Sequence, residues 1–208
     1  MRRDNPSVPV EPIMDALFTA VDAGTVVNIG ASNWSHARIE AANAYAAMCG
    51  RTGSVGDQIS YAYIRPQAPG GVGEDADESM LYLREGDEAW YAAHPDVRIF
   101  AYSSQARGYL TKTLSGAPMH PSIARTYDAP ANRDRARRAA DVADVAAELD
   151  VSVEAVGLAY LFRRAFPVHA VVGPHTRAQL DDTLQAARVV LDDAQLQHLE
   201  GSDRQGDA

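Results

Sequence analysis

The sequence is poor in two chemically useful residues. Cys49 is its only cysteine, and Lys112 is its only lysine beside 18 arginines. A single cysteine permits no disulfide within the chain and no cysteine-based metal cluster. Cys49 falls at the end of an expected helix, where we predict it to be packed and inert. A single lysine leaves one candidate wherever a catalytic lysine is needed.

The chain also lacks long apolar runs and an excess of positive charge. No stretch of 18 apolar residues is present, so no membrane span is expected. Arg2 and Arg3 lead directly into Asp4, Asn5 and Pro6 instead of a secretory signal, which favours a cytoplasmic protein. The net charge of -9 would repel a phosphate backbone, so nucleic acid is not an expected partner. The histidines show no metal-ligand spacing, and no metal site is predicted.

What is present is the composition of an ordinary globular protein. The chain has 208 residues, 46% hydrophobic and 23% charged, which is enough for one sizeable core. We expect a single domain over residues 1–208, with a disordered tail at 201–208. The segment 68–79, APGGVGEDADES, is rich in glycine but lacks the lysine of a phosphate-binding loop, and it is predicted to be flexible.

Short apolar runs alternate with amphipathic stretches along the chain. Strands and helices are therefore predicted in alternation. The expected strands are 25–30, 58–64, 97–103 and 168–173. The expected helices are 10–23, one capped by Ser35, one around EAWYAAH, 131–149, one from Ser152 to before Pro167, one after Thr176, and 192–200. Loops are expected over 65–79 and for about 25 residues after the third strand.

Such an alternation is typical of parallel strands joined by helical crossovers. The sequence predicts an α/β fold with about four parallel β/α units, half the number in a closed (β/α)8 barrel.

Polar residues follow the predicted strands. In parallel α/β folds, ligands bind just past the carboxyl ends of the strands. Because loops are polar in general, the pattern alone fits a binding edge and ordinary loops equally well. The residues at these places are Ser32 and Asn33, Tyr61, Tyr102, Ser103 and Ser104, and Gly173, His175 and Thr176.

The segment GPHTRAQL, residues 173–180, allows two interpretations. Thr176 and Gln179 have the spacing of a capping box, and the N-terminus of the helix that follows, with Arg177 beside it, would suit a phosphate. A plain capped helix has the same spacing.

Five segments resemble the aldo-keto reductases, which are NADPH-dependent (β/α)8 barrels, in order and spacing. They are RDNPSVPVEPIMDAL, VVNIGASNWSHARIEAANAY, FAYSSQARGYL, EAVGLAYLFRRAFPV and VVGPHTRAQLDDTL. The resemblance covers nearly the whole chain. It implies a partial (β/α)8 TIM barrel that matches the C-terminal half of the family's barrel, with NADP as the cofactor.

The resemblance assigns one group of residues to the nicotinamide end of the cofactor. Ser32 and Asn33 match the pair that holds the nicotinamide carboxamide, and Gln58 matches the strand glutamine that joins them. Tyr102 matches the aromatic residue that stacks on the nicotinamide ring, and Ser103 lies beside the pyrophosphate.

A second group matches the clamp for the adenosine phosphate. His175 stands where the family usually has arginine, and Thr183 where it usually has asparagine. Both departures weaken the expected grip on the 2′-phosphate, unless Arg177 substitutes. The residues implied are Gly173, His175, Thr176, Arg177 and Gln179.

The resemblance implies no catalytic residue in these 208 residues. Residues 3–6 match the end of the family's HRDD-like segment, so the position of its histidine falls on Arg2. The family's tyrosine, lysine and aspartate come from earlier strands that nothing here matches. Carbonyl reduction needs a proton donor within about 3 Å of the developing alkoxide. Tyr61 and Tyr63 are the nearest alternatives, but Lys112 has no evident route to tune them.

Three functions remain open. The first is a family member that keeps part of a dinucleotide site without competent carbonyl reduction. The second is a repurposed non-redox enzyme, of the cyclase or dehydratase type, using His175 or the tyrosines. The third is a binding or regulatory module that pairs with another chain. A dinucleotide or another small molecule is the expected ligand, and open sheet edges with an uncovered inner face predict a homodimer or pairing with another half-barrel.

Overall fold

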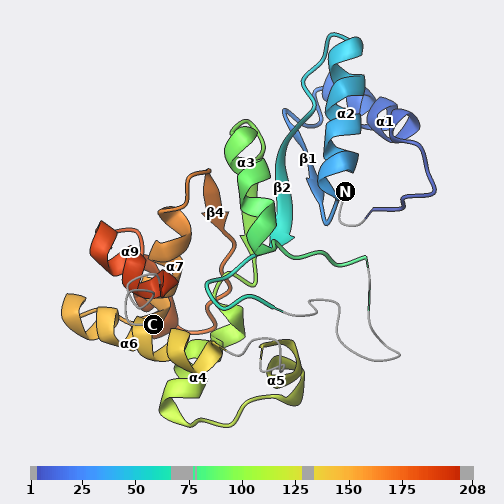
Figure 1. Ribbon diagram of the computed structural model, residues 1–208. Coiled ribbons are helices and arrows are strands. Elements are labelled where there is room, and N and C mark those ends of the chain that lie inside the picture. The colour runs from blue at the N-terminus through green and yellow to red at the C-terminus, as the bar shows by residue number, and fades with distance from the viewer. Residues whose placement is uncertain (1–3, 67–76, 78, 128–133, 202–208) are drawn as a thin grey trace.

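The computed structural model describes residues 4–66, 77, 79–127 and 134–201. They form a sheet of four parallel strands in the order β1-β2-β3-β4, with β1 and β4 at its edges (Figure 1). The predicted parallel α/β architecture is therefore confirmed. The strands are β1 (Ile29–Ser32), β2 (Ser54–Ser60), β3 (Arg98–Tyr102) and β4 (Val168–Ala170).

The strands differ from their predicted bounds, and β3 differs least. β1 spans Ile29–Ser32 and not 25–30, and β2 begins at Ser54 and not at residue 58. The apolar run 61–64 was expected to lie in a strand, but β2 ends at Ser60 and the run is buried after it. Similarly, β4 ends at Ala170, and Val171 and Val172 are partly exposed beyond it. An apolar run signals burial, and burial does not require pairing with a neighbouring strand.

The predicted helices are present, and their caps are largely as expected. Ser35 and Ser152 accept backbone N–H groups at the starts of α2 and α7. The loop expected after β3 instead contains two short helices, α4 and α5. The helices are α1 (Val10–Asp22), α2 (His36–Met48), α3 (Glu88–Ala93), α4 (Tyr109–Ser115), α5 (Pro121–Tyr127), α6 (Arg135–Leu149), α7 (Val153–Phe162), α8 (Arg177–Gln185) and α9 (Asp193–Glu200), with 3-10 turns η1 (Glu85–Asp87) and η2 (Ala106–Gly108).

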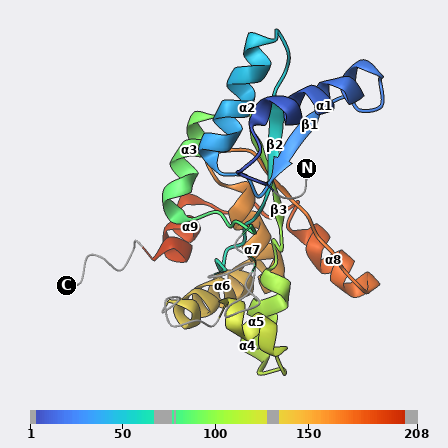
Figure 2. The same ribbon diagram turned by 90° about the vertical axis from the view of Figure 1, so that its right-hand side faces the viewer.

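Helices lie beside both edges of the sheet, and α3 lies between these two groups (Figure 1). The paired helices α1 and α2 lie beside β1, whereas α6, α7 and α9 lie toward β4 (Figures 1 and 2). The core fills the space between the sheet and the helices, with Ile39 of α2, Ile99 of β3 and Leu158 of α7 almost fully buried. Burial of such side chains stabilises the fold by roughly 1.5–3 kcal/mol each.

The opposite face of the sheet is exposed. Gln58, Phe100 and His169 are neighbours in register on β2, β3 and β4, and all three are exposed. The Phe100 and His169 rings stack at 5.1 Å between centroids. The Phe100 ring packs against Gly56, where an added Cβ atom would come within 2.6 Å of a ring carbon. The sheet therefore has one face covered by helices and one face open.

Glu88, at the start of α3, joins three segments behind the sheet. Its Oε1 accepts hydrogen bonds from the Tyr61 hydroxyl at 3.0 Å and from Arg65 at 2.5 Å, and its Oε2 accepts one from Arg164. Arg164 also donates to Glu200 of α9 at 2.6 Å. A partly buried carboxylate shared by two arginines ties α3, α7 and α9 to the segment that leaves β2.

One sequence prediction is wrong, and others concern residues outside the described part of the chain. Cys49 is exposed after the last turn of α2 and is not packed as predicted. Gly201 ends α9 in a left-handed conformation with a φ of 73°, and the remainder of the predicted tail, 202–208, lies outside the described residues. Arg2 and most of the segment 68–79 lie outside them as well. In the described part of the chain, no helix is long and apolar enough to cross a membrane.

Asp57 is a buried carboxyl group on the covered face of β2. Its side chain is fully inaccessible, and Oδ2 accepts a hydrogen bond from the Tyr91 hydroxyl at 2.7 Å. Oδ1 has no hydrogen-bond partner among the described residues. Burial raises the pKa of Asp57 from 3.8 to about 6, while the hydrogen bond from Tyr91 opposes this rise.

This pKa predicts a pH-dependent stability. The folded state binds the Asp57 proton more tightly than the unfolded chain does. The protonated carboxyl therefore contributes its full share of the unfolding free energy below pH 3.8, and this contribution is lost as the pH rises through about 6. Asp57→Asn removes the ionisation but keeps an acceptor for Tyr91. We expect D57N to exceed the wild type in unfolding free energy by up to about 3 kcal/mol near pH 8, and by far less near pH 4. Urea unfolding at both pH values measures this, and a difference independent of pH would contradict it.

Candidate functional site

Ser32 and Asn33 stand at the carboxyl end of β1, both 5% exposed. Ser32 Oγ donates to the backbone carbonyl of Gln58 at 2.8 Å and accepts a hydrogen bond from Asn33 Nδ2 at 3.1 Å. Asn33 has a φ of 57°, in the left-handed region that asparagine tolerates better than most residues. This turn directs the carboxamide of Asn33 across the end of the sheet.

Tyr102, at the end of β3, meets Asn33. Its hydroxyl donates to Asn33 Oδ1 at 2.9 Å and contacts the carbonyl oxygen of Leu81 at 3.2 Å. Two residues assigned to the nicotinamide end, 69 positions apart in sequence, are therefore in direct contact.

A third segment completes this contact. We call residues 79–84 the strap. Leu81 N–H donates to Asn33 Oδ1 at 3.0 Å, and Leu83 N–H donates to the carbonyl of Ser60 at 3.0 Å. Tyr82 forms a parallel bridge with Ser60 at the end of β2. The strap crosses the carboxyl ends of β1, β2 and β3, a position that the sequence analysis did not predict.

Gln58 lies beside this group through its backbone. It pairs in register with Ser32, and its carbonyl accepts both the Ser32 hydroxyl and the Asn33 N–H, the latter at 3.1 Å. Its side chain lies on the open face of the sheet. Of the nicotinamide-end residues, Gln58 alone is exposed.

The loop after β3 has an unusual backbone. Ser103, Ala106 and Arg107 have φ values of 52°, 47° and 57°, and Gly108 follows at 73°. Non-glycine residues in this region cost of order 1–3 kcal/mol each and gather at functional sites. Lys112, expected in a loop, lies on α4 and donates from Nζ to the Arg107 carbonyl at 2.9 Å. The only lysine therefore supports this loop.

The same loop is tied to the last β/α unit. Ser104 Oγ donates to the Val171 carbonyl at 2.9 Å, and Gln105 Nε2 donates to Thr183 Oγ1 on α8 at 3.1 Å. Thr183 is buried and donates in turn to the Gln179 carbonyl. Thr183, which stands where the family usually has asparagine, thus links α8 to the loop after β3.

The capping at the start of α8 differs in one bond from the prediction. Thr176 accepts the Gln179 N–H at 3.2 Å, as expected. However, the Gln179 side chain accepts the N–H of His175 at 2.7 Å, not that of Thr176. The complete capping box lies at Asp192 and Gln195 of α9.

Arg177 is exposed at the α8 N-terminus. Its Nε donates to both carboxylate oxygens of Asp181, at 2.8 and 3.0 Å. The carboxylate of Asp181 offsets the positive charge of Arg177, which was expected to favour binding of a 2′-phosphate. Gly173 and His175 are exposed in the connection from β4.

Tyr61 follows β2 at this edge, where its N–H donates to the Tyr102 carbonyl at 3.3 Å, but the hydroxyls of Tyr61 and Tyr63 have partners elsewhere. The Tyr61 hydroxyl donates to Glu88, and the Tyr63 hydroxyl donates to the Leu199 carbonyl at 2.8 Å. Both are almost fully buried, and burial raises the pKa of each phenol above its ordinary value. Their hydroxyls hold helices to the sheet and do not reach the open face.

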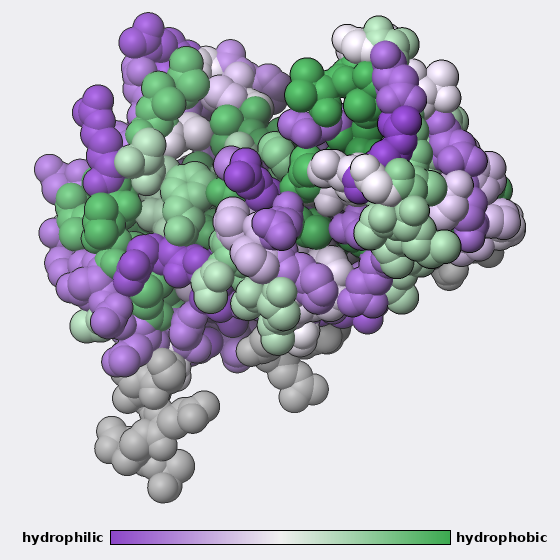
Figure 3. Space-filling view, turned by 90° about the horizontal axis from the view of Figure 1, so that it is seen from above, coloured by the Kyte–Doolittle hydropathy of each residue, from purple (hydrophilic) through white to green (hydrophobic). Residues whose placement is uncertain are grey.

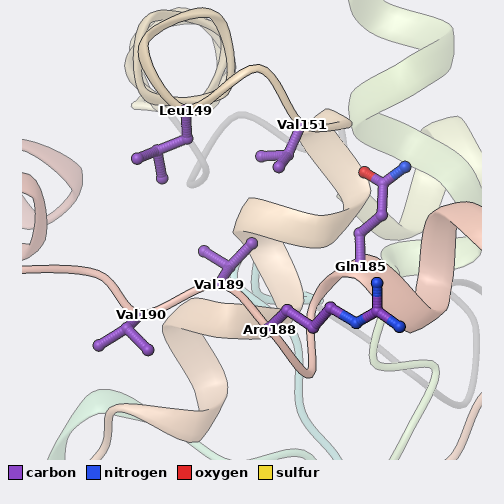
Figure 4. A pocket seen from close by; sticks show the side chains of 6 residues that line it. All are labelled: Leu149, Val151, Gln185, Arg188, Val189 and Val190. Carbon is purple, nitrogen blue, oxygen red and sulfur yellow. The ribbon is translucent and has the colours of Figure 1, made fainter.

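A surface pocket of about 250 Å³ lies elsewhere (Figure 4). It is bounded by the α6–α7 connection and the C-terminal end of α8, opposite to the end of α8 that the predicted site uses. Its lining residues are Leu149, Val151, Gln185, Arg188, Val189 and Val190. None was predicted from the sequence. In the part of the chain that the structure describes, no cluster of three or more His, Cys, Asp or Glu residues is placed to hold a metal ion.

These features define a class of protein: an α/β chain with parallel strands whose carboxyl ends carry converging polar groups. The chain matches the family model described as "Aldo/keto reductase family" over residues 2–204, and it belongs to that family. The resemblance to the aldo-keto reductases that the five sequence segments showed is thereby confirmed.

Solved structures share the fold. A thermostable aldo-keto reductase in complex with the inhibitor epalrestat is 17% identical, with a TM-score of 0.64, over 97% of this chain and 57% of that chain. The aldose reductase from Schistosoma japonicum is 18% identical, with a TM-score of 0.58, over 96% and 48%. This chain thus spans about half the length of these structures. The predicted partial (β/α)8 barrel, with an open sheet, is confirmed. Among curated proteins, no sequence matches this one.

Aldo-keto reductases generally use NADP(H). The residues at the β1 and β3 ends fit the nicotinamide end of such a cofactor, since buried polar groups and an aromatic ring converge there. The α8 end fits less well, because Arg177 is exposed and already paired with Asp181.

Proposed function

We propose that this chain supplies the nicotinamide-binding part of an aldo-keto-reductase site and does not reduce carbonyls by itself. The observation that supports the proposal most strongly is the contact of Asn33 with Ser32 and Tyr102 at the carboxyl edge. These groups come from different strands, and they bring hydrogen-bonding groups and an aromatic ring together in a place of low exposure.

Each part of this arrangement has a chemical use. The Ser32 hydroxyl and the Asn33 carboxamide can donate to and accept from a primary carboxamide, which fixes the orientation of the nicotinamide ring. The Tyr102 ring can stack on it. When bound, the cofactor would supply the hydride, and the loop 103–108 would lie beside its pyrophosphate. Arg177, limited by Asp181, would add little to the binding of a 2′-phosphate.

The binding proposal is tested by comparing two serines on the same strand pair. Ser32→Ala removes a hydroxyl from the carboxyl edge. Ser54→Ala removes one from the opposite end, where Ser54 Oγ contacts Gly56 and Ala31. Both variants lose similar hydrogen bonds within the protein. We expect S32A to weaken NADPH binding roughly tenfold and S54A to leave it unchanged, as measured by cofactor fluorescence. Equal affinities would contradict the proposal.

The lack of carbonyl reduction follows from the placement of the tyrosines. Hydride transfer to a carbonyl needs a proton donor at the developing alkoxide. The hydroxyls of Tyr61 and Tyr63 are engaged with Glu88 and Leu199 behind the sheet. The repurposed-enzyme alternative loses these two candidates, and exposed His175 remains its only named one.

We therefore expect the purified chain to leave NADPH unconsumed in the presence of aldehydes. Loss of NADPH absorbance with aromatic and aliphatic aldehydes, at a rate proportional to protein concentration, would contradict this. A parallel sample with a competent aldo-keto reductase shows that each aldehyde is reducible.

The open sheet supports a second proposal, that two half-barrels associate. Phe100, Val171 and Val172 are 40%, 42% and 38% exposed near the open face, and β1 and β4 are edge strands. In the view from above, apolar residues form several patches separated by polar ones (Figure 3). Exposed edges and apolar patches favour association, and two copies related by a two-fold axis would cover both faces.

Sedimentation velocity tests the association. We expect a dimer at micromolar protein concentration. Phe100→Glu places a charge at the centre of the open face and should shift the equilibrium toward monomer. A compact, soluble wild-type monomer at that concentration would contradict the proposal.

A further inference from the structure

We propose that the strap, residues 79–84, is an autoinhibitory segment that competes with the nicotinamide carboxamide for Asn33. This inference rests on the proposed cofactor site. Residue 81 presents its N–H to Asn33 Oδ1 and its carbonyl oxygen to the Tyr102 hydroxyl. A primary carboxamide offers the same two groups, one donor and one acceptor.

The strap therefore makes the hydrogen bonds with Asn33 and Tyr102 that the carboxamide of a ligand would make. A buried carboxamide without hydrogen bonds would cost roughly 1–3 kcal/mol, and the Leu81 N–H helps to prevent this cost at Asn33. The strap and a cofactor cannot both donate to the same lone pairs of Asn33 Oδ1 while Tyr102 also does so. Occupation by one excludes the other.

The strap is held outside the site by Leu83, and local turns flank it on both sides. Before it, the Ser79 N–H and hydroxyl donate to the Asp77 carboxylate. Beyond its middle, the Leu83 side chain is fully buried, and Arg84 N–H donates to Asp87 at 2.8 Å. The segment around Leu81 can thus leave Asn33 while Leu83 stays in the core.

This competition has a quantitative consequence. The apparent dissociation constant for NADPH equals the intrinsic constant divided by the fraction of molecules with the strap released. Removing one hydrogen bond between the strap and the site raises that fraction and tightens binding. For a bond of ordinary net strength the gain is about 3- to 10-fold.

Two variants release the strap in different ways. Tyr102→Phe keeps the ring for stacking but removes the hydroxyl, which contacts Leu81 and also donates to Asn33 Oδ1. Leu81→Pro removes the N–H that donates to Asn33. The matched control is Tyr45→Phe, which removes a tyrosine hydroxyl that donates to Asp15 between α1 and α2, far from the strap. Circular dichroism checks that each variant is folded. If L81P is not folded, Y102F alone tests the strap inference.

NADPH is titrated into the wild type and the three variants. We expect the apparent dissociation constant to fall about 3- to 10-fold in Y102F and L81P and to stay unchanged in Y45F. Measurable binding that is equal to or weaker than wild type in every folded variant of the strap contacts would overturn the strap inference and leave the proposed site standing. No binding by any of the four proteins would overturn the proposed function itself, and the strap inference with it.

Discussion

The carboxamide of Asn33 is the interaction on which the carboxyl edge of the sheet depends. It lies one residue past β1 and joins Ser32, the Tyr102 hydroxyl at the end of β3, and the Leu81 N–H of the strap. A buried amide requires such partners. The left-handed turn at Asn33 is stabilised by the contacts that it makes possible. The edge is therefore ordered by its own polar groups, and these are the groups that a ligand would have to engage.

The rest of the fold supports this edge from one side only. Helices cover one face of the sheet, where the Glu88 cluster joins α3, α7 and α9, while Phe100 and His169 stack on the other face. A parallel sheet with one open face and two edge strands is an incomplete barrel, and its carboxyl edge lies at the border between the covered and the open side. The two proposals about ligand binding and association thus concern adjacent parts of one surface.

Much of this arrangement could be predicted from the sequence. Apolar alternation indicated four parallel β/α units, and the caps at Ser35 and Ser152 were correct because capping is a local interaction. The assignment of Asn33 and Tyr102 to one end of a cofactor came only from the family resemblance, and their direct hydrogen bond was not predicted. The strap was missed because Leu81 contributes backbone groups, which leave no signature in a sequence. The exposure of Cys49 was missed because burial at the end of a helix depends on tertiary packing, which a local sequence pattern does not give.

The central claim is that the dinucleotide binds at the carboxyl edge. The most direct measurement is the mapping of backbone amide chemical shifts in ¹⁵N-labelled protein as NADP⁺ is added. We expect the largest changes in chemical shift at Ser32, Asn33, Leu81 and Tyr102, with smaller changes near Gln179. Changes confined to other surfaces, such as the pocket around Val151 and Val189, or no changes at saturating cofactor, would contradict it.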